Sequence, residues 1–583
     1  MKLPAWITVS VLFFTFQSCF AGDSKLDAAA ALSEVATGAN PDVKKLREAY
    51  LKLQWERLLG NIEVKRLEAT QVIRGEPGPA LSEDERARLK TWLEQDSAFR
   101  DRLLLALSPY DDDYPSAARV ALTLHEKFQK QFTELENLAI AFVTVWDDPS
   151  IVKTLHGWHV PELMNDEKMK TCTLEESFGW FASKQSRLCP WLKTMPWRLL
   201  TYVAADSTTI AERDWTMTKF PVFRNNLGTV YSDIEYDMVK LRDAKGKIAG
   251  HEYTMENVKQ YGGVCRDQAW FARAACSTYG MPAYFAVGQG NSAVRHAWVG
   301  WIIQEAGAYK LLSHGRYEYD KYFTAQIVDP RTGLYILDYL VGIEARALSD
   351  EKGYDAADLY YRVWQECPQL PAQNRVNLLV SALRKNAFHR AAWMAMGDAT
   401  AAGDLPRASA EAQWDYLLKN FRDFPDFTFS MLSAFSRMFK TPAERYTFYE
   451  TTAKFFVNLK RQDLVASLRI EEIDMCVGEN RKDLAAQVAV AGTQECAGEG
   501  EQGAALAKRA AELLTEMNQP QLAIKPLQMA LMKMPKTRAK FINPHWYSVM
   551  EVLRDVYKAS GDTKNAAGTQ AELEKVAKSA AVE

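Results

Sequence analysis

"YGGVCRDQAWFARAACSTYGMPAYF" occupies residues 261–285 and contains the change of pattern on which the fold depends. Two glycines and a valine precede Cys265, and small and apolar residues at helical spacing follow it. Gly280 and Pro282 are typical of a helix end, and the apolar run after them is typical of a strand. The sequence therefore predicts a helix that starts at Cys265 and leads directly into a strand.

Further short apolar runs follow, separated by glycines and polar residues, and they predict an antiparallel sheet after this helix. The expected strands are "AYFAVGQG" (283–290), "RHAWVGWIIQ" (295–304), "AYKLLS" (308–313), "YFTAQIVDP" (322–330) and "LYILDYL" (334–340).

Cys265 has the position of a nucleophile. The free N–H groups and the dipole at a helix start stabilise a thiolate. Gly262 and Gly263 would let the backbone approach a substrate closely, and the N–H of Cys265 would help to hold an oxyanion. Cys276, in the same helix, lies among alanines and is expected to pack in the core.

A nucleophilic cysteine needs a base, and His296 opens the strand "HAWVGWII". A lone histidine at a strand end is more often structural than catalytic. One helix and one strand separate His296 from Cys265, and this coupling favours a nucleophile–base pair.

The blocks "GGVCRDQAWFARAACSTYGMPAYFAVGQG", "RHAWVGWI" and "IVDPRTG" together resemble the core of the transglutaminase-like family of papain-like cysteine enzymes. The resemblance covers roughly residues 225–345. It implies an α+β fold with a helix packed on an antiparallel sheet. It also implies a Cys-His-Asp triad, with Cys265 as nucleophile and His296 as general base, that transfers or hydrolyses an amide through a thioester.

The third member of the triad is open. The motif favours Asp329, although it follows His296 at a longer distance in sequence than the family usually shows. If a tight hairpin forms about residues 305–308, cross-strand pairing instead brings Tyr317 and Glu318 near His296, with Asp320 also in reach. Asp329 would then serve only as the first residue of an Asp-Pro turn.

The chain of 583 residues, with 48% hydrophobic residues, is long enough for three or four domains. Residues 22–145 are expected to be helical, and Ser82 and Glu85 have capping-box spacing. Residues 146–345 are expected to form the transglutaminase-like domain. Residues 350–583 predict helix pairs like tetratricopeptide repeats, but no strict period holds, so a plain helical domain is the alternative.

The first 21 residues have the pattern of a signal peptide. A positive start, the apolar run "ITVSVLFFTF" and small residues at Cys19 and Ala21 predict export and cleavage after Ala21. "FQSC" is a poorer match to a lipoprotein box, in which Cys19 would carry the lipid. We expect a secreted or periplasmic protein, with lipid anchoring as the alternative and without a stable membrane span.

Composition limits the cofactors and partners. A net charge of −3 shows no basic excess for nucleic acid. Zinc-binding spacings and acidic loops with calcium-ligand spacing are absent, so no metal or organic cofactor is expected. Seven cysteines follow Ala21, and Cys172–Cys189 and Cys476–Cys496 are candidate disulfides that leave at least one free thiol.

These observations predict an exported cysteine enzyme, either a hydrolase or an acyltransferase, with a protein or peptide substrate such as a cell-wall peptide. One alternative is an inactive transglutaminase-like scaffold that binds proteins. Another is a disulfide-linked structural protein in which Cys265 is bridged. Trp298 and Trp301 are expected in the core rather than in a substrate groove.

Overall fold

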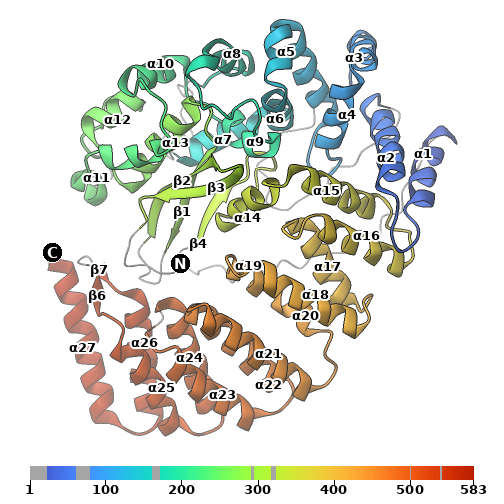
Figure 1. Ribbon diagram of the computed structural model, residues 1–583. Coiled ribbons are helices and arrows are strands. Elements are labelled where there is room, and N and C mark those ends of the chain that lie inside the picture. The colour runs from blue at the N-terminus through green and yellow to red at the C-terminus, as the bar shows by residue number, and fades with distance from the viewer. Residues whose placement is uncertain are drawn as a thin grey trace.

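Helices surround one antiparallel sheet in this computed structural model (Figure 1). The structure describes residues 23–60, 79–159, 171–243, 245–289, 295–316, 324–498, 500–538 and 541–582. The helices before the sheet are α1 Asp23–Val35, α2 Val43–Leu58, α3 Glu83–Gln95, α4 Ser97–Ala106, α5 Tyr114–Glu134, α6 Glu136–Trp146, α7 Pro149–His159, α8 Leu174–Lys184, α9 Trp197–Ala204, α10 Ile210–Lys219, α11 Met238–Asp243, α12 Met255–Tyr261 and α13 Cys265–Thr278, with the 3₁₀ helices η2 Gln185–Arg187 and η3 Leu227–Asp233.

The central sheet has the strand order β3-β2-β1-β4-β5, and all its pairs are antiparallel. Its strands are β1 Ala283–Gln289, β2 Arg295–Glu305, β3 Ala308–His314, β4 Thr324–Val328 and β5 Tyr335–Leu337. The predicted helix and the five predicted strands are confirmed, and the chain is α+β with helical flanks. The ends of two runs differ: β4 stops at Val328, before the turn at Asp329, and helix α14 already begins at Tyr339.

The hairpin between β2 and β3 is the tight one that the sequence allowed. Glu305 pairs with Ala308, and Ala306 and Gly307 between them both have positive φ, 49° and 80°. This backbone matches the twist of a two-residue hairpin turn. The pairing continues as far as Val299 and His314, so the turn sets which β3 residues approach the start of β2.

The Gly-Gly pair before α13 serves a contact within the chain. Gly262 has φ +80°, and a Cβ there would lie 2.5 Å from the carbonyl oxygen of Glu235. The N–H of Gly263 donates to that carbonyl at 2.9 Å, and the N–H of Asp237 donates to the carbonyl of Gly263 at 2.9 Å. The expectation that these glycines leave room for a substrate is therefore wrong: residues 235–237 occupy the space.

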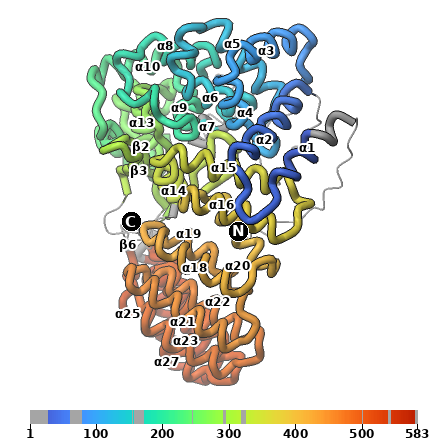
Figure 2. The backbone as a smooth tube through the Cα atoms, turned by 45° about the vertical axis from the view of Figure 1, so that its right-hand side comes forward, coloured from blue at the N-terminus to red at the C-terminus, as the bar shows by residue number. Residues whose placement is uncertain are grey.

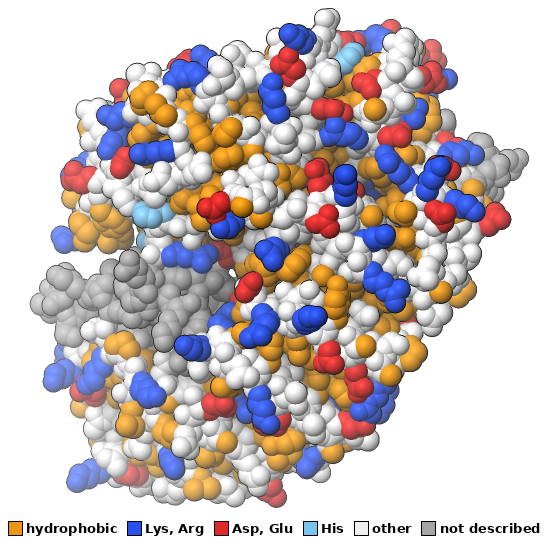
Figure 3. All heavy atoms as spheres, viewed as in Figure 1, with side chains coloured by type: hydrophobic (Ala, Val, Ile, Leu, Met, Phe, Trp, Pro, Cys, Tyr) orange, Lys and Arg blue, Asp and Glu red, His pale blue; other side chains and the backbone are white. Residues whose placement is uncertain are grey.

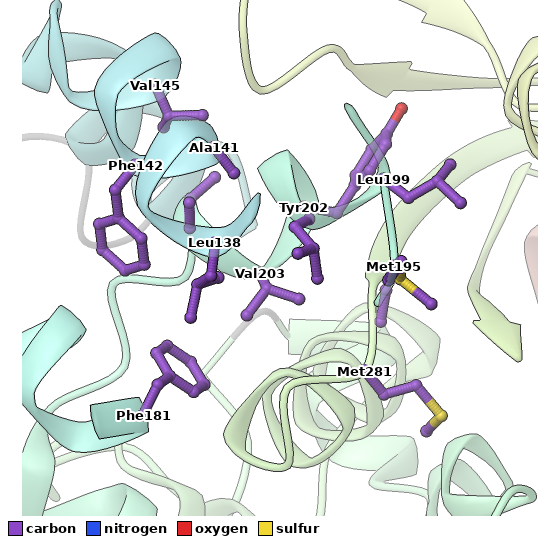
Figure 4. Close-up of a cluster of buried hydrophobic side chains, with 14 of the residues drawn as sticks. Leu138, Ala141, Phe142, Val145, Phe181, Met195, Leu199, Tyr202, Val203 and Met281 are labelled. Atoms are coloured by element: carbon purple, nitrogen blue, oxygen red, sulfur yellow. The ribbon is translucent and has the colours of Figure 1, made fainter. Parts of the chain in front are cut away.

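The helices α3–α9, α13 and the sheet share one hydrophobic core. In Figure 4, Leu138 and Phe142 from α6 lie beside Val203 from α9 and Phe181 from α8. Ser82 caps α3, and the side chain of Glu85 accepts the N–H of Ser82 at 2.7 Å, which confirms the predicted capping box. Helices α3–α6, before residue 146, and helices α7–α9 and α13 with the sheet, after it, therefore pack around the same core.

Of the remaining N-terminal helices, α2 reaches this core through Leu58, but its other buried apolar residues and those of α1 lie elsewhere. They share a second core with helices after the sheet (Figures 1 and 2), and α2 lies against α15. Both oxygens of Glu366 accept hydrogen bonds from Arg57, at 2.5 and 2.7 Å, and Tyr360 donates to the carbonyl of Pro41 at 2.9 Å. The described helices before residue 146 are thus divided between two cores.

The C-terminal part consists of helices that pack side by side in chain order (Figure 2), with a third core near the end. Helices α17 and α18 lie on either side of Gly403, which ends α17 in the left-handed conformation. The elements are α14 Tyr339–Leu348, α15 Glu351–Glu366, α16 Ala372–Lys385, α17 Arg390–Ala402, α18 Arg407–Asn420, α19 Pro425–Ser430, α20 Leu432–Ser436, α21 Pro442–Asn458, α22 Gln462–Gly478, α23 Lys482–Glu495, α24 Gly500–Glu516, α25 Pro520–Met532, β6 Thr537–Arg538, β7 Phe541–Ile542, α26 Pro544–Ala559 and α27 Thr563–Val582.

Candidate functional site

Cys265 is the first residue of α13, as predicted. Among the cysteines in the described ranges it alone is partly exposed, and the others are buried. Two backbone N–H groups, those of Arg266 in the helix and of Ala297 in β2, face its Sγ and act to lower the pKa of the thiol. The helix start and the beginning of β2 therefore meet at this sulfur.

The pKa of Cys265 shifts upward, which differs from the expectation of an activated thiolate. Burial is the largest cause, and the charge of Asp267 adds to it. The two N–H groups and Arg266 act in the opposite direction, as expected at a helix start, but they do not outweigh burial. Burial therefore acts against a preformed thiolate at this sulfur.

Asp267 caps the helix that carries Cys265. Its buried carboxylate accepts hydrogen bonds from the N–H of Val264 at 2.7 Å, from Lys240 Nζ at 2.8 Å and from the Tyr253 hydroxyl at 2.5 Å. Asp267 therefore both caps the helix and acts on the cysteine, because its charge raises the pKa of Cys265.

His296 lies at the same end of the sheet as Cys265. It is buried, and it directly precedes Ala297, whose N–H faces the Cys265 sulfur. Its Nε2 lies 2.5 Å from the carbonyl oxygen of Gly315, which can only accept a hydrogen bond. Nε2 therefore carries the proton, and the lone pair of the neutral ring is on Nδ1.

Gly315 can hold this position only as glycine. Its φ is +94°, and a Cβ there would lie 2.6 Å from the ring of Tyr231. The Tyr231 hydroxyl in turn donates to the carbonyl of Ala297 at 3.1 Å. The residues around the imidazole are thus fixed from both β2 and η3.

The structure does not bring Asp329 to His296. In the sheet His296 pairs with Gly288, and Gly288 pairs with Ala325, so Ala325 marks the level of the histidine on β4. Asp329 lies four residues farther along, about 13 Å at the usual rise of a strand. It is therefore not the acid beside His296, because β4 runs away from the site.

Asp329 forms a turn instead. Its carboxylate accepts the N–H groups of Arg331 at 2.8 Å and Thr332 at 3.3 Å. This is the Asp-Pro alternative that the sequence left open. Glu318 and Asp320, the other candidate acids, lie outside the described residues, as does Tyr317.

Asp338, a buried carboxylate just after β5, was not predicted as part of the site. It accepts hydrogen bonds from Arg316 and from the N–H of Ala325, and the indole of Trp298 also faces it. Burial raises its pKa, while Arg316 acts against the shift. Arg316 directly follows Gly315, so this acid supports the segment that holds His296. An aspartate inside the apolar run "LYILDYL" was the available signal.

Tyr236 was also missed, since it lies in a segment without a motif. It forms a parallel bridge with Gly263, two residues before Cys265. Its hydroxyl oxygen faces the backbone N–H of Cys265, the group expected to help hold an oxyanion. A substrate oxygen would therefore compete with the Tyr236 hydroxyl for the N–H of Cys265.

Trp298, Trp301 and Cys276 are buried in the core, as predicted. The thiol of Cys172 donates to the carbonyl of Thr208 at 2.9 Å, and that of Cys189 donates to the carbonyl of Gly280 at 3.1 Å.

The candidate disulfides are therefore not formed. Cys172 and Cys189 are separate thiols, and Cys476 is a free thiol as well. In the described ranges Cys265 is also a thiol, not half of a bridge.

Within the described ranges, His, Cys, Asp and Glu residues form no group of three or more that would hold a metal ion. None of the helices in these ranges has both the length and the apolar character to cross a membrane. The expected signal peptide and Cys19 lie outside the described residues.

Comparisons with known proteins add little to this geometry. No protein-family model matches the chain, and no curated protein matches it. The crystal structure of BtubC (BKLC) from P. vanneervenii is similar over 40% of this chain and 90% of its own, with 13% identity and a TM-score of 0.22. At that TM-score the likeness carries no argument about fold or function.

Proposed function

We propose that this protein is a transglutaminase-like cysteine enzyme that cleaves or transfers the acyl group of an amide in a protein or peptide. One observation carries the proposal: the Cys265 sulfur lies at the start of a buried helix and against the N–H of Ala297, the residue next to His296. A helix that leads into an antiparallel sheet, with the histidine on its second strand, agrees with the family resemblance.

The reaction would begin with proton transfer from the Cys265 thiol to Nδ1 of His296. The sulfur attacks the carbonyl carbon of the amide, and the oxyanion that forms accepts a hydrogen bond from the N–H of Cys265. The proton on Nδ1 then passes to the leaving amine as the C–N bond breaks, which leaves a thioester. Attack by water gives hydrolysis, and attack by a second amine gives transfer.

The raised pKa of Cys265 favours proton transfer during attack over a preformed thiolate–imidazolium pair. The Gly315 carbonyl, 2.5 Å from His296 Nε2, would orient the ring as a carboxylate does in other triads. Glu318 and Asp320 are the candidates for an additional acid. The enzyme would be exported and would act on a cell-wall peptide.

Acylation by p-nitrophenyl acetate tests this function, because the reagent forms a thioester on an active thiol. We expect an acetyl group on Cys265 in the full chain, none on that residue in Cys265→Ser, and acylation at least about 100-fold slower in His296→Gln. His125→Gln, on α5 beside Trp92, is the matched control and should keep the full rate. Equal rates in His296→Gln and the control would refute the assignment of the base.

An inactive scaffold is the second candidate. The turn-forming Asp329 and the upward shift of the Cys265 pKa favour it, as do the side-by-side helices after the sheet, which are typical of protein-binding arrays. Slow acylation of Cys265 that does not change in His296→Gln would select this function over the enzyme.

A further inference from the structure

Large apolar side chains are exposed on and beside α11. Tyr236 is 37% exposed, Met238 50%, Val239 49% and Leu241 44%. We call these four residues the α11 patch. Figure 3 shows hydrophobic side chains gathered on the surface where Figure 1 places α11. Four such residues within six positions form a contiguous apolar surface, which in a folded protein often marks a binding site.

The backbone at Tyr236 is an open strand edge. In its parallel bridge with Gly263, the hydrogen bonds come from the carbonyl of Glu235 and the N–H of Asp237. The N–H and C=O of Tyr236 itself therefore point to the opposite side. Neither group has a hydrogen-bond partner among the described residues, and the residue is exposed. An extended chain placed there would satisfy both groups.

Hydrogen bonds fix this edge relative to Cys265. The carboxylate of Asp237 accepts the N–H groups of Val239 at 2.9 Å and Lys247 at 2.6 Å, which holds the start of α11. Lys240 of α11 pairs with Asp267, the cap of the Cys265 helix, at 2.8 Å. The α11 patch and the thiol thus belong to one rigid arrangement.

We propose that the Tyr236 edge and the α11 patch bind an extended peptide that pairs through its backbone and places a large apolar side chain beside Cys265. Backbone pairing gives affinity for any extended peptide, and the patch gives a preference for leucine-like residues. This inference rests on the proposed function, since it names the substrate class of the same site: a peptide with an apolar residue near the acyl group.

A binding experiment with the full-length Cys265→Ser chain tests the inference without requiring catalysis. The probes are fluorescein-labelled Gly-Ser-Leu-Gln-Leu-Ser-Gly and the same peptide with serine in place of leucine, measured by fluorescence anisotropy. We expect the leucine peptide to bind about tenfold more tightly, from the burial of one apolar side chain. N-methylation of the leucine peptide at successive backbone nitrogens should weaken binding at one position or more.

The matched variants separate the patch from general surface effects. In the Cys265→Ser chain, Met238→Ser with Leu241→Ser should abolish the preference for leucine, whereas Met532→Ser, at an 83% exposed methionine on α25, should keep it. Equal affinity for the two peptides, or an unchanged preference in the double variant, overturns the inference. Failure of acylation with an intact leucine preference would instead reject the enzyme and keep the peptide site.

Discussion

At the scale of single residues, Cys265 is subject to opposing influences. The helix start supplies N–H groups, which the sequence shows through the position of the cysteine. Burial by the surrounding helices raises the pKa, and no local pattern reveals how much protein will cover one side chain. The residue type and its donors were therefore predictable, whereas the direction of its pKa shift was not.

The charge of Asp267 can be removed to test this balance. Because that charge raises the pKa of Cys265, Asp267→Asn should lower the pKa and increase the thiolate fraction at a fixed pH. Iodoacetamide should then alkylate Cys265 several-fold faster at pH 8, and the rate should reach its plateau at a lower pH. Glu256→Gln, on the preceding helix, should leave the profile unchanged. A profile that moves to higher pH in Asp267→Asn would contradict the assigned sign.

Gly262 gives a second residue-scale prediction. Both Gly262→Ala and Gly250→Ala place a side chain at positive φ, but only at Gly262 would the Cβ approach a backbone oxygen, at 2.5 Å. We expect Gly250→Ala to lower the free energy of unfolding by about 1 kcal/mol and Gly262→Ala to lower it by about 1–3 kcal/mol more. Urea unfolding measures both, and equal losses would show that the close approach has no cost.

At the scale of elements, the β2–β3 hairpin was predictable and the strand order was not. Two residues between apolar runs, one of them glycine, are enough to specify a tight turn. The pairing of β4 with β1 instead of β3 depends on contacts across the whole sheet. That pairing moves Asp329 away from His296, so a motif read along the chain assigned the wrong acid.

Gly315 tests whether the end of this hairpin positions the histidine. A Cβ at Gly315 would strike the Tyr231 ring, so Gly315→Ala should displace the carbonyl that holds His296. We expect acylation of Cys265 to slow by about tenfold or more, the loss caused by a misplaced catalytic group. Gly307→Ala, at the other end of β3 with nothing within 4 Å, should retain the rate. Equal acylation rates in both variants would show that Gly315 does not position His296 for the reaction.

At the scale of the whole molecule, α1 and α2 are structural partners of the helices after the sheet. Arg57 and Glu366 form an ion pair whose side chains are only 13% and 7% exposed. The sequence predicted the helices on both sides, but it carried no signal that the first two would cross to α15, because such packing depends on surfaces more than 300 residues apart.

This ion pair provides a test of that packing. Arg57→Ala leaves the Glu366 carboxylate buried without its partner, and we expect a loss of about 3–5 kcal/mol in the free energy of unfolding. Removing both side chains should cost clearly less than the sum of the two single losses. Additive losses, measured by urea unfolding of the four proteins in the cycle, would show that the pair is not coupled.

The shared core of α1 and α2 with α15 and α16 also bears on biosynthesis. The apolar faces of the first helices emerge early from the ribosome, but their partners are complete only at Lys385. At ordinary elongation rates the intervening stretch takes roughly 15–60 s to synthesise. Throughout that interval the apolar faces of α1 and α2 are exposed on the nascent chain. A chaperone or transport factor that binds apolar helix surfaces would therefore bind these two helices.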